Sequence, residues 1–235
     1  AFVKVQEGCN EFCSFCVIPF ARGRSRSRTV ESTVSQVERL VQSGYQEVVL
    51  TGVHIGDYGM DLDVRFVDLL EAGERGKGLK RFRGSSIEAT FLTPEVIDFL
   101  ASTPKFCCHL HVPLQSGDDS ILSAMRRPYR SAFYADLLDR LADRIPGIGI
   151  GADVMVGFPG ESEAAFRNTV GLVESSPLVF LHVFPYSPRG NTPAAKLSDN
   201  VGPAVRKQRG AELRELAKSK TEVFQRQFLG QPLDV

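Results

Sequence analysis

The chain has 235 residues, enough to bury one large α/β core or two small ones. Its 28 Lys and Arg residues balance its 28 Asp and Glu residues, so contact with a polyanion must come from a local patch. No apolar run reaches the roughly 20 residues of a membrane helix and no signal peptide is recognisable, which predicts a cytoplasmic protein without a membrane partner. Five cysteines, an odd number, favour metal or redox chemistry over a disulfide framework.

The hydrophobic period switches between two and 3.6 along the chain, which is typical of alternating strands and helices. Predicted strands cover residues 3–5, 47–52, 82–89, 107–114, 147–158 and 178–186. Predicted helices cover residues 29–44, 64–74, a segment beginning at 93–94, a region 118–144 that Pro128 interrupts, 161–175 and 202–228.

Six strand and helix alternations without an antiparallel hairpin signal predict a parallel sheet with right-handed crossovers. The unit count favours an α/β fold, a partial (β/α)6 TIM-like barrel, in one domain over residues 1–235. In such folds the chemistry lies at the carboxyl ends of the strands. The loops there are residues 8–28, 51–61, 84–93, 113–120, 153–162 and 185–193.

The first of these loops carries Cys9, Cys13 and Cys16 in a CxxxCxxC pattern. Three soft thiolates suit zinc or an iron–sulfur cluster. A structural zinc site needs a fourth protein ligand, yet no cysteine or histidine follows before His54. A four-iron cluster on three cysteines would leave one iron open to a small molecule.

This spacing resembles the radical S-adenosylmethionine (SAM) superfamily. The runs "KVQEGCNEFCSFCVIPFARGRSRSR", "VLTGVHIGDYG", "SSIEA", "HLHVPLQSGDDSILSAMRR", "GADVMVGFPGE" and "HVFPYSPRGNTPAA" resemble, in the same order, the loops of its methylthiotransferase family. The resemblance implies a 4Fe-4S cluster on the three cysteines, whose open iron chelates SAM and whose electron cleaves it to a 5′-deoxyadenosyl radical.

The same resemblance implies partners outside residues 1–235. A second 4Fe-4S cluster would lie on an N-terminal domain, and a small RNA-binding β-barrel would begin near "QPLDV". The family also implies tRNA as substrate and an electron donor such as a flavodoxin-type protein. Both flanking domains are expected to be absent from the chain.

Three branches of the family differ in substrate. Asn10 after the first cysteine, together with "LTGVHIGDYG", "SSIEA" and "FPYSPRGNTPAA", resembles the branch that adds a methylthio group to threonylcarbamoyladenosine next to the tRNA anticodon. The alternatives are the branch that acts on isopentenyladenosine in tRNA and the branch that acts on an aspartate of a ribosomal protein. An alternative of another class is a non-catalytic, zinc-stabilised RNA-binding module.

Candidate cofactor-binding residues lie at the strand ends, and no catalytic side chain is assigned. Gly52 would let the backbone approach a ligand closely, although a plain turn would also explain it. Glu88 would accept hydrogen bonds from ribose hydroxyls or the cofactor's ammonium group. Asp153 points into an apolar interior, where a carboxylate needs a partner or a ligand. The full set is Phe15, Gly52, His54, Ser86, Glu88, Gln115, Asp153 and Tyr186.

Four arginines follow the cysteines at alternate positions. In an extended chain they would lie about 7 Å apart, near the phosphate spacing of a single strand. Arg24 and Arg26 are therefore candidate RNA-binding residues, against the alternative of a solvated loop. Arg22 and Arg28 match the family's RGxxxSR pattern and are assigned to cofactor or structural pairing.

Overall fold

Six parallel strands form the centre of the protein, in the order β1–β4–β5 and β6–β7–β8. The computed structural model describes residues 1–74, 78–198 and 200–232, so the end of the "QPLDV" run lies outside the described residues. The strands are β1 (Phe2–Lys4), β4 (Glu47–Thr51), β5 (Arg81–Gly84), β6 (His109–His111), β7 (Gly149–Val156) and β8 (Leu178–Pro185). The predicted α/β fold with a parallel sheet is confirmed.

The two three-stranded halves meet at a seam between β5 and β6. One isolated parallel bridge joins Phe82 to Phe106, and the Cys107 amide donates to the Phe82 carbonyl at 2.9 Å. Within the described residues no ladder pairs β1 with β8. The sheet is therefore an open, partial barrel, as the unit count predicts.

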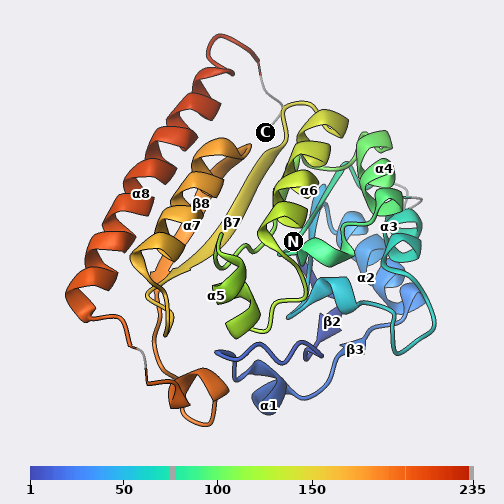
Figure 1. The fold of residues 1–235 in the computed structure, drawn as a ribbon. Coiled ribbons are helices and arrows are strands. Elements are labelled where there is room, and N and C mark those ends of the chain that lie inside the picture. The colour runs from blue at the N-terminus through green and yellow to red at the C-terminus, as the bar shows by residue number, and fades with distance from the viewer. Residues whose placement is uncertain (75–77, 199, 233–235) are drawn as a thin grey trace.

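Helices cover the sheet at the predicted places. Figure 1 shows α6 and α7 beside β7 and β8, α8 along the far edge, and α2, α3 and α4 grouped on the other half. Within the described residues, none of the helices combines the length and apolar character needed to cross a bilayer. The helices are α2 (Val30–Gln42), α3 (Phe66–Glu74), α4 (Pro94–Ser102), α5 (Asp119–Ala124), α6 (Ser131–Arg144), α7 (Glu163–Ser175) and α8 (Pro203–Arg226).

Side-chain caps fix where several of these helices begin. The Thr29 hydroxyl accepts the Ser32 amide at α2, and the Thr93 hydroxyl accepts the Val96 amide at α4, where Pro94 occupies the first turn. Ser162 caps α7 in the same way. Buried and exposed residues alternate along β1 as the sequence predicts, since Val3 is fully buried whereas its neighbour Phe2 is 77% exposed.

Two of the predicted strands are shorter than the sequence indicates. The predicted strand over 82–89 ends at Gly84, and Glu88 then caps a 3₁₀ helix, η2 (Ala89–Phe91), by accepting the Ala89 amide at 3.2 Å. Of the predicted strand over 107–114, only the three residues of β6 form a strand. Beyond β6 the Val112 amide still donates to the Gly151 carbonyl at 2.8 Å, and an isolated parallel bridge joins Gln115 to Val154.

The cysteine loop also carries structure that the sequence analysis missed. An antiparallel pair, β2 (Gln6–Glu7) with β3 (Arg26–Ser27), closes its base, and a short helix, α1 (Ile18–Arg22), lies inside it. The prediction of a parallel sheet holds for the six central strands, and this short antiparallel pair lies outside that sheet. The hairpin signal is hidden because 18 residues separate the two strands instead of a short turn (residues 8–25).

Gly8 is the position in this loop that tolerates no side chain. Its φ is +75°, and a Cβ would lie 2.0 Å from the Arg24 carbonyl oxygen. We expect Gly8→Ala to lower the free energy of unfolding by about 2 kcal/mol, from left-handed strain and a displaced hairpin. Urea denaturation measures this, and Gly73→Ala in α3, where a Cβ meets nothing within 4 Å, is the matched control. Equal stability of the two variants would contradict the assigned clash.

Candidate functional site

The three cysteines lie in the loop between β2 and α1, at the end of the molecule toward which β7 and β8 point (Figure 1). Ser14, in the middle of the loop, anchors it. The Ser14 amide donates to the Met125 carbonyl at 3.0 Å, and its hydroxyl donates to the Ala124 carbonyl at 2.7 Å. The Ala194 amide, in η3 (Pro193–Lys196), donates to the Ser14 carbonyl at 2.9 Å. The loop is thus held by the β2–β3 pair at its base and by α5 and η3 at its centre.

Each cysteine sulfur has one N–H group directed at it. The Glu11 amide donates to Cys9 Sγ at 3.3 Å, and the Ile18 amide donates to Cys16 Sγ at 3.4 Å. The Arg127 guanidinium donates from Nη1 to Cys13 Sγ at 3.3 Å. Hydrogen bonds to sulfur are a standard means of stabilising ligating thiolates and of setting the potential of an iron–sulfur cluster. The donor set therefore fits a cluster held by three cysteines.

Burial controls the protonation of these thiols. It raises the pKa of the Cys9 thiol to about 12 and also raises the pKa of the Cys13 thiol, against the lowering effect of Arg127. Both groups are therefore thiols at neutral pH before any metal binds. Because a metal takes up the thiolate, ligation must release these protons.

A buried ion pair lies behind Cys13. Arg127 and Glu88 form it with side chains only 5% and 6% exposed. The Tyr129 hydroxyl accepts from Arg127 Nε at 3.2 Å and donates to the carbonyl of Leu114 at 3.0 Å. Burial by itself would lower the pKa of Arg127, but neighbouring Tyr129, Glu88 and Cys13 raise it, so the guanidinium stays charged. Sequence reasoning named Glu88 and missed Arg127, since nothing in "SAMRRPY" indicates its partner.

Three predicted cofactor-binding residues carry buried polar atoms without a hydrogen-bond partner within the described residues: His54 Nε2, Gln115 Oε1 and Tyr186 Oη. Such atoms are costly unless a ligand or water pairs with them. His54 Nδ1 accepts the Asp57 amide at 3.3 Å, so the neutral ring carries its proton on the unpaired Nε2. Gln115 also has a φ of +68°, a strained conformation that clusters at functional sites. These residues fit a polar cofactor beside the cysteine loop.

Asp57 is a further site residue that the sequence analysis missed. Its carboxylate accepts the Asn10 amide at 3.2 Å. Cys9, His54 and Asp57 each offer a donor atom within 4.8 Å of the other two, a set that also suits zinc. Cys13 and Cys16 lie outside this set, whereas a cluster employs all three cysteines.

Gly52 and Phe15 have packing partners in the structure. A Cβ at Gly52 would lie 2.7 Å from Gln6 Oε1, so the close approach there is made by a side chain of the protein. Phe15 packs against a small buried cluster that includes Met155, Phe158 and Tyr186. Their contact with a cofactor stays a prediction.

Ser86 and Asp153 are joined through a histidine. The Ser86 hydroxyl lies 2.7 Å from His111 Nδ1, and Asp153 Oδ1 lies 3.3 Å from both His111 Nε2 and His182 Nδ1. Burial raises the pKa of Asp153, but the two imidazoles outweigh it and the net direction is downward. The inference that Asp153 needs a partner is confirmed, whereas contact of Ser86 or Asp153 with a cofactor stays a prediction.

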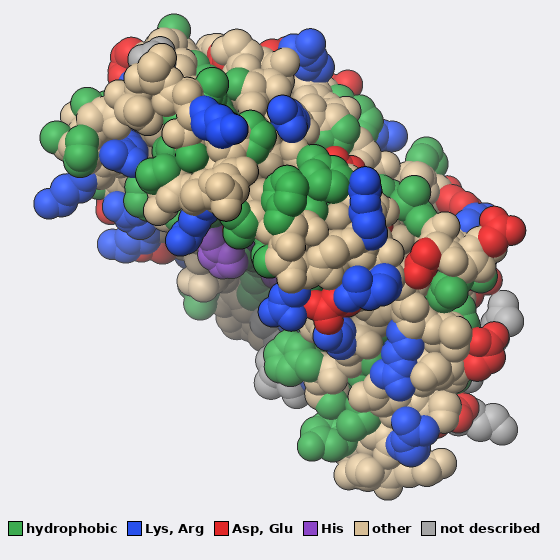
Figure 2. All heavy atoms as spheres, turned by 90° about the horizontal axis from the view of Figure 1, so that it is seen from below, with side chains coloured by type: hydrophobic (Ala, Val, Ile, Leu, Met, Phe, Trp, Pro, Cys, Tyr) green, Lys and Arg blue, Asp and Glu red, His purple; other side chains and the backbone are tan. Residues whose placement is uncertain are grey.

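Of the four arginines, Arg22 and Arg28 have the structural partners that the sequence analysis allows for them. Arg22 pairs with Glu7 at 3.2 Å, and Arg28 Nε donates to Ser32 Oγ at 2.9 Å. Arg24 and Arg26 are exposed, with the Arg24 guanidinium 4.6 Å from the centre of the Phe12 ring. Figure 2, which views this end of the molecule, shows Lys and Arg side chains spread over it and a histidine beside a hollow. Binding of RNA by Arg24 and Arg26 stays a prediction.

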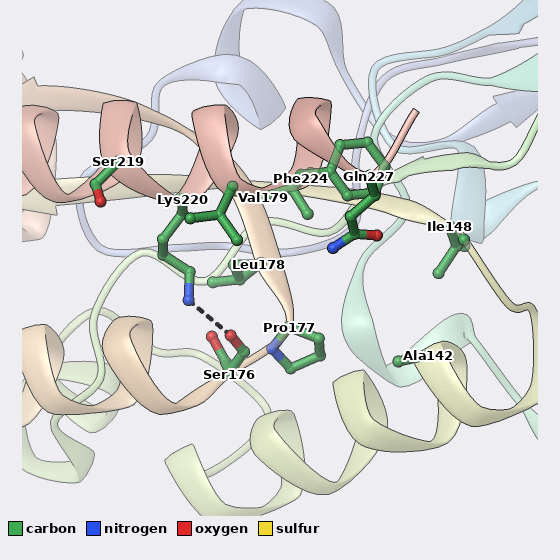
Figure 3. A pocket seen from close by; sticks show the side chains of 12 residues that line it. Ala142, Ile148, Ser176, Pro177, Leu178, Val179, Ser219, Lys220, Phe224 and Gln227 are labelled. Atoms are coloured by element: carbon green, nitrogen blue, oxygen red, sulfur yellow. Dashed lines mark hydrogen bonds between the residues drawn. The ribbon is translucent and has the colours of Figure 1, made fainter. Parts of the chain in front are cut away.

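A cavity of about 470 Å³ lies at the opposite ends of the strands (Figure 3). Ile148 and Leu178, at the starts of β7 and β8, line it together with Phe224 of α8. Lys220 closes one side by donating to the Ser176 carbonyl at 2.8 Å. This cavity is far from the carboxyl edge of the sheet, where the cysteines lie.

Comparison with known proteins agrees with this arrangement. The chain is 45% identical over 237 aligned residues to the threonylcarbamoyladenosine tRNA methylthiotransferase MtaB of Bacillus subtilis, covering all of this chain and 52% of that protein. It is 40% identical over 218 residues to a tRNA-2-methylthio-N(6)-dimethylallyladenosine synthase of Carboxydothermus hydrogenoformans, covering 92% of this chain and 50% of that protein. The chain thus spans about half the length of the curated relatives it matches.

A solved structure shows the same fold. The radical S-adenosylmethionine methyltransferase TsrM of Kitasatospora setae, solved with cobalamin and a 4Fe-4S cluster, superposes with a TM-score of 0.70 at 20% identity, covering 83% of this chain and 38% of that one. The Radical SAM superfamily itself matches residues 3–173, from β1 into α7 and through the whole cysteine loop. The chain therefore belongs to the radical SAM superfamily.

Proposed function

We propose that this chain is the radical SAM core of a tRNA methylthiotransferase that acts on threonylcarbamoyladenosine next to the anticodon. The observation that carries the proposal is 45% identity across the whole chain to an enzyme of that name. Support from the site comes from three cysteines on one loop, each with an N–H donor, and from nearby buried polar atoms that need a ligand.

Cys9, Cys13 and Cys16 would hold a 4Fe-4S cluster, and His54, Gln115 and Tyr186 would contact bound SAM. When bound, this pair of cofactors supplies a radical that removes hydrogen from an otherwise unreactive carbon. The protein's own residues hold the cysteine loop, exclude water from Cys9 and Cys13, and keep the Arg127 guanidinium against Cys13. Phe15, Gly52, Ser86, Glu88 and Asp153 complete the proposed surroundings of SAM.

The remaining partners belong to the same proposal. Arg24 and Arg26, both exposed beside the loop, would contact tRNA phosphates. A second cluster on an N-terminal domain, an RNA-binding β-barrel after this chain and an electron donor of the flavodoxin type would complete the enzyme. Residues 1–235 would form the central domain.

The dimethylallyladenosine branch is the second candidate, because a member of it is 40% identical to this chain over 92% of its length. The two substrates differ in the arm on the adenine N6 atom. One arm carries a carboxylate and a hydroxyl, whereas the other is a hydrocarbon. The groups that face this arm must therefore differ in polarity.

Mass spectrometry of tRNA nucleosides tests the choice. In cells without the full-length protein, we expect complete loss of the methylthio derivative of threonylcarbamoyladenosine and no change in the methylthio derivative of isopentenyladenosine. Re-expression of the wild-type protein should restore the first nucleoside, and re-expression of Cys13→Ala should not. Loss of the isopentenyl derivative instead would assign the chain to the second candidate.

A further inference from the structure

A cavity of about 530 Å³ lies between the two halves of the barrel, separate from the cysteine loop. Thr51 and Arg83 line it from the first half, and His109, His111 and His182 line it from the second. Ser86, which also lines the cavity, is only two residues from Glu88. The cavity therefore reaches the segment that leads to Glu88.

Two unpaired polar atoms lie on residues that line this cavity. Ser85 Oγ and His109 Nδ1 are buried and have no hydrogen-bond partner within the described residues, whereas His111 Nε2 lies 3.3 Å from Asp153 Oδ1. A buried donor or acceptor left unpaired costs roughly 1–3 kcal/mol. An occupant that supplies hydrogen-bonding groups would remove this cost, and a hydrocarbon would not.

The arrangement of the three histidines indicates which hydrogen-bonding groups the occupant carries. His109 is fixed by stacking on Phe180, with ring centres 5.3 Å apart and planes 8° apart. His111 is fixed by Ser86 on its Nδ1 side and faces Asp153 with its Nε2 atom. The cavity therefore combines N–H donors with one carboxylate acceptor. This combination is complementary to a ligand that carries both a carboxylate and a hydroxyl.

We propose that this cavity binds the polar N6 arm of the modified adenosine, with His109 and His182 recognising its carboxylate and Asp153, which is thereby assigned to the substrate instead of SAM, accepting from its hydroxyl. The assignment rests on the proposed function and names the residues that select this substrate. The same cavity explains rejection of a dimethylallyl arm, which would leave Ser85 and His109 unpaired. His182, 66% exposed, lies where an arm would enter.

Binding of two matched RNAs tests the assignment without relying on turnover. The full-length protein, reconstituted with its cluster and SAM, is titrated with anticodon stem–loops that carry either threonylcarbamoyladenosine or its carboxylate methyl ester. Fluorescence anisotropy should show about tenfold tighter binding of the acid, the effect of one charge-assisted hydrogen bond. We expect His109→Phe, which keeps the stacked ring, and His182→Ala, at an exposed position, to bring this ratio close to one.

Arg140→Ala, on the exposed part of α6, removes a cation elsewhere and should leave the ratio unchanged. If both histidine variants keep the tenfold ratio, the cavity is not the arm site, even though the proposed function survives. If the wild-type protein modifies only RNA with an isopentenyl arm, the proposed function itself fails. His111, Asp153 and His182 also place donor atoms within 4.8 Å of one another. One divalent metal per chain that is lost in His182→Ala, without any acid preference, would overturn the proposal in favour of a cation site.

Discussion

Replacing Cys13 by Ala will abolish cluster binding and leave most of the fold in place. Three cysteines hold the four-iron cluster, and two are too few to retain it, so bound iron should fall from about four per chain to near zero. The cysteine is small and buried, and its removal should cost only about 1 kcal/mol of unfolding free energy. Iron analysis and visible absorption after anaerobic reconstitution measure the first effect, and urea denaturation of the metal-free chain measures the second.

Cys108→Ala is the matched control, because Cys108 is exposed and lies outside the cysteine loop. This variant should keep a full cluster. A full cluster in Cys13→Ala would contradict the ligand assignment. One zinc and no iron in the wild-type protein would favour the zinc-stabilised module, held by Cys9, His54 and Asp57.

Replacing Arg127 by Met should destabilise the protein by about 3–5 kcal/mol. The change leaves the Glu88 carboxylate, only 6% exposed, without its charged partner in the interior. Adding Glu88→Gln to Arg127→Met should recover part of this loss, because the double variant buries no unpaired charge. Chemical denaturation of the metal-free single and double variants gives the coupling free energy directly.

Arg144→Met provides the comparison for Arg127→Met. Arg144 pairs with Asp98, and both side chains are more than half exposed, at 58% and 59%. Water already solvates these charges, so this loss should be at most about 1 kcal/mol. Equal losses in Arg127→Met and Arg144→Met would mean that the pair behind Cys13 is not a stabilising element of the core.

Much of the fold is predictable because the hydrophobic period and the residues that begin or end an element are local features of the sequence. Strands are predicted by alternating Val3 and Val5 and by the apolar run of β7, and a helix start is predicted by the Thr93–Pro94 pair. The three cysteines stand out by spacing alone. The "SSIEA" run could not be resolved in this way, because the strand ends at Gly84 and a 3₁₀ helix capped by Glu88 follows, and the apolar pattern marks neither.

Partners distant in sequence are the part that could not be predicted. Asp153 plainly requires a partner, yet only the register of β7 against β6 and β8 shows that two histidines provide it. Arg127 lies 39 residues from Glu88 and 114 from Cys13, and no local pattern links them. Such pairs depend on how the strands are ordered, which local periodicity does not encode.

The cysteine loop also connects the two halves of the barrel, which meet at the seam between β5 and β6. The loop leaves the first half of the barrel after β1 and β2, and Ser14 fastens it to α5 and η3 of the second half. It thus joins the two halves at the end where the cysteines lie, in addition to the Phe82–Phe106 bridge and the backbone hydrogen bond from Ile87 to His111 at the seam. The segment that carries the three cysteines is therefore also a connection between the two halves whose side chains line the cavity between them.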